Sequence, residues 1–89
     1  MTDTIALMHE RLAVLSPSHL EILDDSARHK GHAGAREGGH YRLAIASTAF
    51  EGLSTLARHR MIHAALGDLM RHGIHALSIQ AATSAEFQS

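Results

Sequence analysis

The sequence contains no cysteine, and this absence excludes disulfide bonds, thiolate metal ligands and a cysteine nucleophile. It also lacks any apolar run that approaches the ~20 residues needed to span a membrane, so we expect no membrane partner. The first ten residues have no basic segment followed by an apolar core, and they therefore do not form a secretory signal. Together these absences predict a cytoplasmic protein.

Aromatic residues are scarce, and the net charge is close to zero. Only 3% of the residues are aromatic, whereas 45% are hydrophobic and 19% are charged, which is typical of a globular chain rather than a disordered one. A chain of 89 residues is expected to form one domain over residues 1–89. The formal net charge of −1 indicates that the chain as a whole is not built to attract nucleic acid.

Two stretches have the hydrophobic spacing of helices. Residues 4–15 form the first, with Thr2 or Asp3 as the N-cap, and the serine before Pro17 ends it because that position disfavours helical backbone. Residues 53–70 form the second, as one helix or two, and Gly73 is its C-cap. The apolar stripe of this second stretch consists of Leu56, Ile62, Leu66, Leu69 and Met70.

Alternating hydrophobic and polar residues predict three strands, at residues 19–25, 40–47 and 74–81. A long glycine-bearing connection joins the first two, which favours an antiparallel hairpin. The helical crossover before the third strand makes that strand parallel to the second. The sequence thus predicts an α+β fold with a three-stranded mixed sheet, helices on one face, the order α-β-β-α-(α)-β, and a frayed tail at residues 83–89.

Histidine is in marked excess, with nine copies in the chain. The connection RHKGHAGAREGGHY, residues 28–41, holds three of them together with four glycines. His29 and His32 lie three residues apart, but two histidines do not complete a zinc site. Because the chain has no cysteine, a metal bound here must take its remaining ligands from another molecule. The glycines would let the backbone approach such a metal closely.

Two further histidines open strands. His75 begins the third predicted strand and has the same parity as Leu77 and Ile79, so its residue type alone predicts a partly buried side chain with a backbone partner. His40 begins the second strand and is assigned a structural role. No spacing of serine, histidine and aspartate suggests a catalytic triad, and we expect no enzymatic activity.

The segment FEGLSTLARHRMIHAALGDLM (residues 50–70), followed by GIHALSIQAAT (residues 73–83), closely resembles the BolA family. The upstream frame LEILDDSARH…HYRLAIAS, within residues 20–47, resembles it too. The resemblance covers nearly the whole chain. It implies the α-β-β-α-β order with a short extra helix, a class II KH-like arrangement, which agrees with the order predicted from the hydrophobic pattern.

The resemblance implies a non-enzymatic partner of a monothiol glutaredoxin, bound directly or across a shared [2Fe-2S] cluster, in cluster assembly, cluster transfer or iron regulation. The glutaredoxin would give its active-site cysteine and a glutathione thiolate. This chain would give His75, which matches the family's C-terminal histidine, and one histidine of the connection between the first two strands. His29 matches the position of the family's ligand in this connection, and His32 is the alternative. The choice stays open because the segment GGHY is two residues shorter than in many members, which would shift the connection. The chain alone would hold no cofactor.

Other members of the family are DNA-binding regulators of stress response and cell shape, which gives an alternative function. The candidate contacts to nucleic acid or to a partner protein are basic, namely Lys30, Arg36, Arg58 and Arg60. The helical region at residues 53–73 would then act as a helix-turn-helix. We expect a monomer when the protein is alone, with a dimer through an exposed strand edge as the other option.

Overall fold

The computed structural model describes residues 3–25 and 39–88. The predicted order of elements is confirmed, with one further helix at the C-terminal end. Two short 3₁₀ turns, η1 (Ala13–Leu15) and η4 (Thr48–Phe50), follow α1 and β2. The helices and strands are α1 (Thr4–Leu12), β1 (His19–Asp24), β2 (Gly39–Ala46), α2 (Thr55–Leu66), α3 (Leu69–His72), β3 (Ile74–Ala82) and α4 (Ser84–Gln88).

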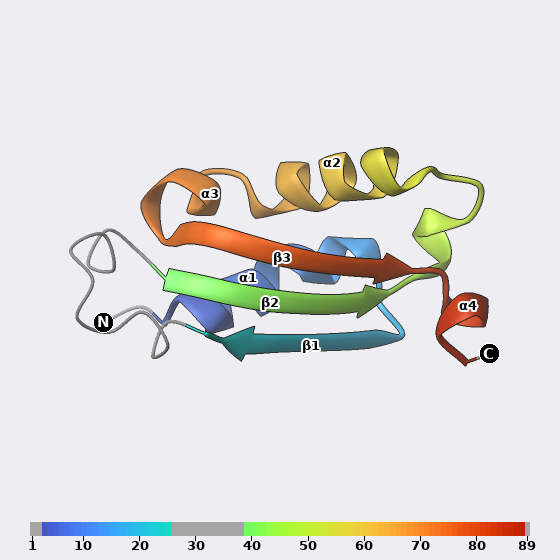
Figure 1. The fold of residues 1–89 in the computed structure, drawn as a ribbon, viewed down its shortest axis with the longest axis horizontal. Helices are drawn as coiled ribbons and strands as arrows, with labels where there is room; N and C mark the ends of the chain where they lie inside the picture. Colours follow the sequence, from blue (N-terminus) through green and yellow to red (C-terminus); the bar gives the residue numbers. More distant parts are fainter. Residues whose placement is uncertain (1–2, 26–38, 89) are drawn as a thin grey trace.

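The three strands form one mixed sheet in the order β1-β2-β3, as Figure 1 shows. The pair β1–β2 is antiparallel and the pair β2–β3 is parallel, and both orientations confirm the prediction. Leu43 is the centre of the register, because it lies opposite Ile22 on one side and Ile79 on the other. The starts of β2 and β3 therefore meet at one end of the sheet, together with the end of β1.

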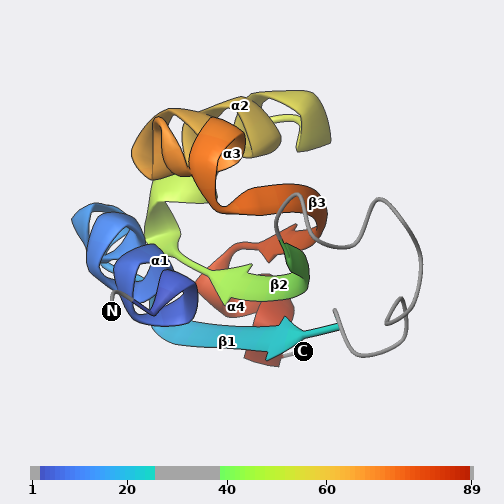
Figure 2. The same ribbon diagram turned by 90° about the vertical axis from the view of Figure 1, so that its left-hand side faces the viewer.

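Helices α1, α2 and α3 gather on one side of the sheet (Figure 2). This confirms the predicted placement of helices on one face. The core lies between the helices and β2, because alternate residues of β2 point inward. Its buried members are Met8, Leu12, Tyr41, Leu43, Ile45, Phe50, Ile62, Leu66, Leu69 and Ile74.

The first helix begins and ends where its local sequence requires. The carboxylate of Asp3 accepts a hydrogen bond from the backbone N–H of Ile5 at 3.1 Å, which satisfies one of the donors that a helix leaves open at its start. After η1 the chain turns at Ser16, whose φ of 48° is in the left-handed region. The next residue is Pro17, and the helix cannot continue through it.

The C-terminal residues are ordered by a capping box, although the sequence predicts that they fray. The Thr83 hydroxyl accepts from the N–H of Glu86 at 3.0 Å, and the Glu86 carboxylate accepts from the N–H of Thr83 at 2.8 Å. These reciprocal bonds start α4. Phe87 then stacks on His19 of β1 with ring centres 4.2 Å apart, so α4 lies against the sheet at the end opposite the start of β2 (Figure 1).

Across residues 3–25 and 39–88 no helix has the length and apolar character needed to cross a membrane. The cytoplasmic location stays a prediction.

Candidate functional site

His75 stands at an irregularity in the pairing of β2 with β3. Gly39 pairs with Ile74, whereas the next residue, His40, pairs with Ala76. His75 is therefore an extra residue on β3, as in a β-bulge, and such an insertion changes the direction of a side chain without breaking the sheet. Strict alternation would place His75 on the same face as the core-facing Leu77, but the extra residue interrupts the alternation between them. As a result, His75 is exposed instead of packed into the core.

His40 lies directly beside His75. The two ring centres are 5.1 Å apart and the ring planes are inclined by 44°. The residues are far apart in sequence, and the parallel pairing of two strand starts brings them together. The sequence predicts a structural role for His40, because the pattern within one strand does not show which residue lies beside it on the next. The signal that could have found the pair is that each of two neighbouring parallel strands has a histidine as its second residue.

Backbone hydrogen bonds hold the chain around this pair in place. The N–H of Asp25 donates to the carbonyl of His40 at 2.7 Å, and the N–H of Gly39 donates to the carbonyl of Gly73 at 3.2 Å. These two hydrogen bonds connect the end of β1, the start of β2 and the turn after α3. Side chains carried by such paired backbone have a defined position relative to each other.

A hollow on the sheet adjoins His40. Its lining includes Asp25, Arg42 and Ser78 as well as His40. The carboxylate of Asp25 and the guanidinium of Arg42 form an ion pair at 3.4 Å, and the Arg42 side chain is largely exposed. Within the part of the chain that the structure describes, no three side chains of histidine, cysteine, aspartate or glutamate are grouped to hold a metal.

The predicted ligands in the connection between β1 and β2 cannot be placed. His29, His32, Lys30 and Arg36 all fall within residues 26–38, which lie outside the described residues. The connection starts after Asp25 and ends at Gly39, and both of these residues adjoin the position of His40. Whether His29 or His32 is a ligand stays a prediction.

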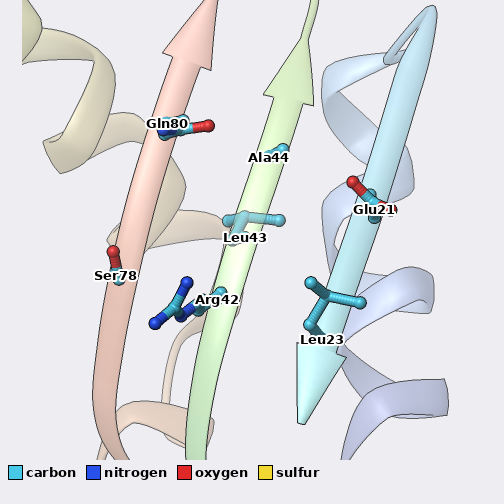
Figure 3. A pocket seen from close by; sticks show the side chains of 7 residues that line it. All are labelled: Glu21, Leu23, Arg42, Leu43, Ala44, Ser78 and Gln80. Atoms are coloured by element: carbon cyan, nitrogen blue, oxygen red, sulfur yellow. The ribbon is translucent and has the colours of Figure 1, made fainter. Parts of the chain in front are cut away.

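A second hollow lies on the face of the sheet opposite α1, α2 and α3, and it shares Arg42 and Ser78 with the first hollow. Figure 3 looks onto this face, and its lining comes from all three strands. It combines one acidic and one basic side chain with the exposed Leu23. The residues around it are Glu21, Leu23, Arg42, Leu43, Ala44, Ser78 and Gln80. This mixture gives a shallow polar surface with no group of metal-binding side chains.

Comparison with known proteins identifies the family. The family model described as BolA-like protein matches residues 12–86, which include both histidines of the pair. This chain belongs to the BolA family. The BolA-like protein 1 of Homo sapiens is 45% identical over 74 residues, covering 83% of this chain and 53% of that protein. The chain thus spans about half the length of the curated relatives it matches first.

The likeness of this BolA chain to its relatives extends to structure and to a bacterial protein. The solved BolA domain of SufE1 from Arabidopsis thaliana superposes with a TM-score of 0.82 at 42% identity, over 97% of this chain and 98% of that one. The α+β fold with a three-stranded mixed sheet is therefore the BolA fold. The protein named DNA-binding transcriptional regulator BolA, from Escherichia coli strain K12, is 34% identical over 76 residues, 85% of this chain and 70% of that protein.

Arg58, one of the predicted contact residues of this BolA chain, makes bonds inside the molecule. Its guanidinium donates to the carbonyls of Leu53 and Ala81 at 3.0 and 3.2 Å, and to the carboxylate of Glu86 at 2.8 Å. Only 13% of its side chain is exposed. The hydrogen bond from Arg58, followed by that from the backbone of Thr83, lowers the pKa of Glu86 to about 2. Arg60, by contrast, is exposed on α2.

The helical region of this BolA chain consists of α2 and the much shorter α3. The latter has four residues, about one turn, and its Leu69 is buried in the core. A recognition helix has to present several side chains to the base edges of the major groove. One turn that is held in the core offers little surface for that purpose.

Proposed function

We propose that this protein is a non-enzymatic BolA partner of a monothiol glutaredoxin, and that the two proteins hold a [2Fe-2S] cluster between them. His75 would be one ligand, and His29 or His32 would be the second from this chain. The glutaredoxin cysteine and a glutathione thiolate would complete the set. The function served would be cluster assembly, cluster transfer or iron regulation.

The observation that carries the proposal is the exposed position of His75 at the β-bulge. A cluster shared with a second protein needs a ligand that the second protein can reach, and a histidine in the core would not meet that need. Bulges are found near functional sites because they redirect one side chain while the sheet stays intact. His75 also lies at the end of the sheet where the chain enters and leaves residues 26–38.

The chemistry of the donor set also fits a shared cluster. Imidazole nitrogens ligate iron in Rieske-type [2Fe-2S] centres, where two histidines replace two cysteines on one iron. The present chain offers imidazoles and has no thiol, so it cannot provide the four protein ligands of an ordinary cysteine-bound cluster. The missing thiolates must come from a partner. The bound cluster would supply the iron and sulfide, and this chain would supply neutral ring nitrogens.

The test is a titration of the full chain into a cluster-loaded monothiol glutaredoxin, followed by visible circular dichroism. The wild type should produce a new spectrum, because imidazole ligation changes the electronic environment of the iron. His75→Ala should abolish the change, and one of His29→Ala and His32→Ala should do the same. His72→Ala is the matched control, since this exposed histidine at the end of α3 has no proposed role.

Two results would overturn the proposal. The first is a spectrum that stays that of the glutaredoxin alone at excess wild-type protein. The second is a new spectrum that His75→Ala leaves unchanged, because the chain would then bind without acting as a ligand. Far-ultraviolet circular dichroism of each variant separates loss of ligation from loss of fold.

DNA binding is the second candidate, and the name of the Escherichia coli relative favours it. The described arginines give it limited support. Arg11 donates to the carbonyl of Leu66 at 3.0 Å, while Arg42 and Arg58 are paired with carboxylates. The formal net charge of the chain is −1, and we expect weak binding that falls steeply with salt. Tight, sequence-selective binding in a fluorescence-anisotropy titration at physiological salt would reverse the ranking of the two functions.

A further inference from the structure

The rings of His40 and His75 are separated by the distance that two imidazoles on one metal ion would have. A tetrahedral zinc ion lies about 2 Å from each imidazole nitrogen, and hence about 3.2 Å from each ring centre. Two rings bound to one such ion have their centres about 5 Å apart. The observed separation of the two ring centres is 5.1 Å. The spacing of the two strands at this point thus matches the spacing that a shared metal ion requires.

The rigidity of the backbone adds to this geometry. Both histidines belong to strands, and the bulge that turns His75 outward lies at the register step next to His40. Metal sites carried on strands or helices are held more closely to their geometry than sites on loops. His40 is half-buried and His75 is exposed, so one ligand is supported by the fold and the other is open to solvent.

We propose that His40 and His75 together bind a single divalent cation of the zinc type, a class of metal that favours imidazole nitrogen. Among the described residues no third metal-binding side chain joins the pair, and we assign the remaining positions to water. The nearby carboxylate of Asp25 is ion-paired with Arg42 and is assigned no ligand role. Such a site binds more weakly than a structural zinc site with four protein ligands.

This site does not depend on the proposed cluster, although the two share His75. A cation that occupies both rings leaves His75 unable to ligate iron, so zinc and the cluster exclude each other. The inference uses residues of this chain alone, and its test needs neither a glutaredoxin nor a cluster. Failure of the zinc experiment and failure of the cluster experiment can therefore be told apart.

The test is a calorimetric titration of the full-length apoprotein with zinc chloride, with two-dimensional NMR of the imidazole nitrogens as the second readout. His40→Phe and His75→Phe keep a planar ring in the pair but remove its ligand nitrogens. Each should lower the zinc affinity at least about tenfold, because each removes one of two protein ligands. In the wild type, the ring-nitrogen signals of these two histidines should shift together as zinc is added.

Two control variants separate this site from its rivals. His59 and His63 lie four residues apart on α2, a spacing that also suits a metal, and His63→Phe removes that possibility. The double variant His29→Ala, His32→Ala removes the two histidines three residues apart in the connection between β1 and β2. Both controls should bind zinc within about twofold of the wild type, since neither alters the proposed ligands.

The proposal is overturned if His40→Phe binds zinc as tightly as the wild type. It is also overturned if His63→Phe or the double variant abolishes binding while His40→Phe and His75→Phe retain it. Thermal unfolding of the metal-free variants checks that each is folded, so that a lost signal reports on the ligand rather than on the fold.

Discussion

The ring of Tyr41 covers the backbone of Gly39, two residues earlier on β2. A β-carbon built on Gly39 would come within 2.5 Å of Cε2 and Cζ of that ring and would also overlap the hydroxyl. Real atoms do not approach so closely, and Tyr41 is a buried member of the core. Glycine at this position therefore allows the tyrosine to close the core at the same end of the sheet as His40 and His75.

Replacing this glycine tests the relationship directly. Gly39→Ala should displace the Tyr41 ring and lower the free energy of unfolding by about 1–3 kcal/mol, the usual cost of overpacking a core. Urea unfolding measures this loss. In a Tyr41→Leu background the same substitution should cost clearly less, because the clashing ring is gone. An equal cost in both backgrounds would show that the ring is not the cause.

A second prediction compares two apolar residues that flank the start of α2. Phe50, from η4, is fully buried, whereas Leu56 is 59% exposed. Phe50→Ala should therefore lower the free energy of unfolding by about 3–5 kcal/mol. Leu56→Ala should change it by less than about 0.5 kcal/mol, as is usual at the surface. Chemical denaturation of the two variants decides the matter, and a similar loss in both would contradict the observed packing.

Leu56 also marks a limit of the sequence-based prediction. Periodicity places it on the apolar stripe of residues 53–70, but α2 begins only at Thr55, so Leu56 lies in the first turn, where less of the core surrounds it. Three members of that stripe are buried as predicted, namely Ile62, Leu66 and Leu69. Hydrophobic spacing identifies the helix and most of its buried face, because these depend on neighbours three and four residues apart.

The position of His75 could not be predicted from alternation. A period of two holds only while each residue on one strand faces one residue on the next, and the extra residue on β3 breaks that correspondence. The pairing of His75 with His40 depends in turn on the parallel register, which residues within a single strand do not determine. The family resemblance pointed to His75, whereas only the three-dimensional arrangement brought His40 to it.

The order of α4 differs from the sequence-based prediction of a frayed tail for a related reason. Thr83 and Glu86 have the spacing of a capping box, which is a visible sequence signal. What fixes the helix to the rest of the molecule is Arg58, which lies 28 residues before Glu86 along the chain. A contact at that separation depends on the fold, and it cannot be predicted from a local sequence pattern.

The ion pair of Arg58 and Glu86 predicts a pH dependence of stability. The pKa of Glu86 is lowered from 4.5 to about 2 in the folded protein, mainly by the hydrogen bond from Arg58. A carboxyl group with a lowered pKa stabilises the fold fully above its unfolded value, and this contribution is lost as the pH falls toward the folded value. The unfolding free energies of wild type and Glu86→Gln should thus differ most above pH 4.5 and converge near pH 2.

Urea unfolding at several pH values measures this difference, with Glu51→Gln as the control, because Glu51 is an exposed glutamate next to η4. The control should follow the wild type at each pH. A difference between wild type and Glu86→Gln that stays constant from pH 7 to pH 2 would contradict the assigned ion pair.

The last prediction concerns Ser47, which is buried, with a relative exposure of 1%. Its hydroxyl donates to the carbonyl of Leu15 at 2.6 Å and accepts from the N–H of Ala49 at 3.0 Å, so it joins the end of η1 to the end of β2. Ser47→Ala would remove both of these partly buried hydrogen bonds and leave the carbonyl of Leu15 and the N–H of Ala49 without this partner, and we expect it to lower the free energy of unfolding by about 1–3 kcal/mol. Ser18→Ala is the matched control, since the Ser18 hydroxyl also bonds to a carbonyl but the residue is exposed to water, which can replace that bond. Ser47→Thr keeps the hydroxyl and should recover part of the loss. If Ser47→Ala unfolds at the same urea concentration as Ser18→Ala, the buried hydroxyl is not what holds η1 against the sheet.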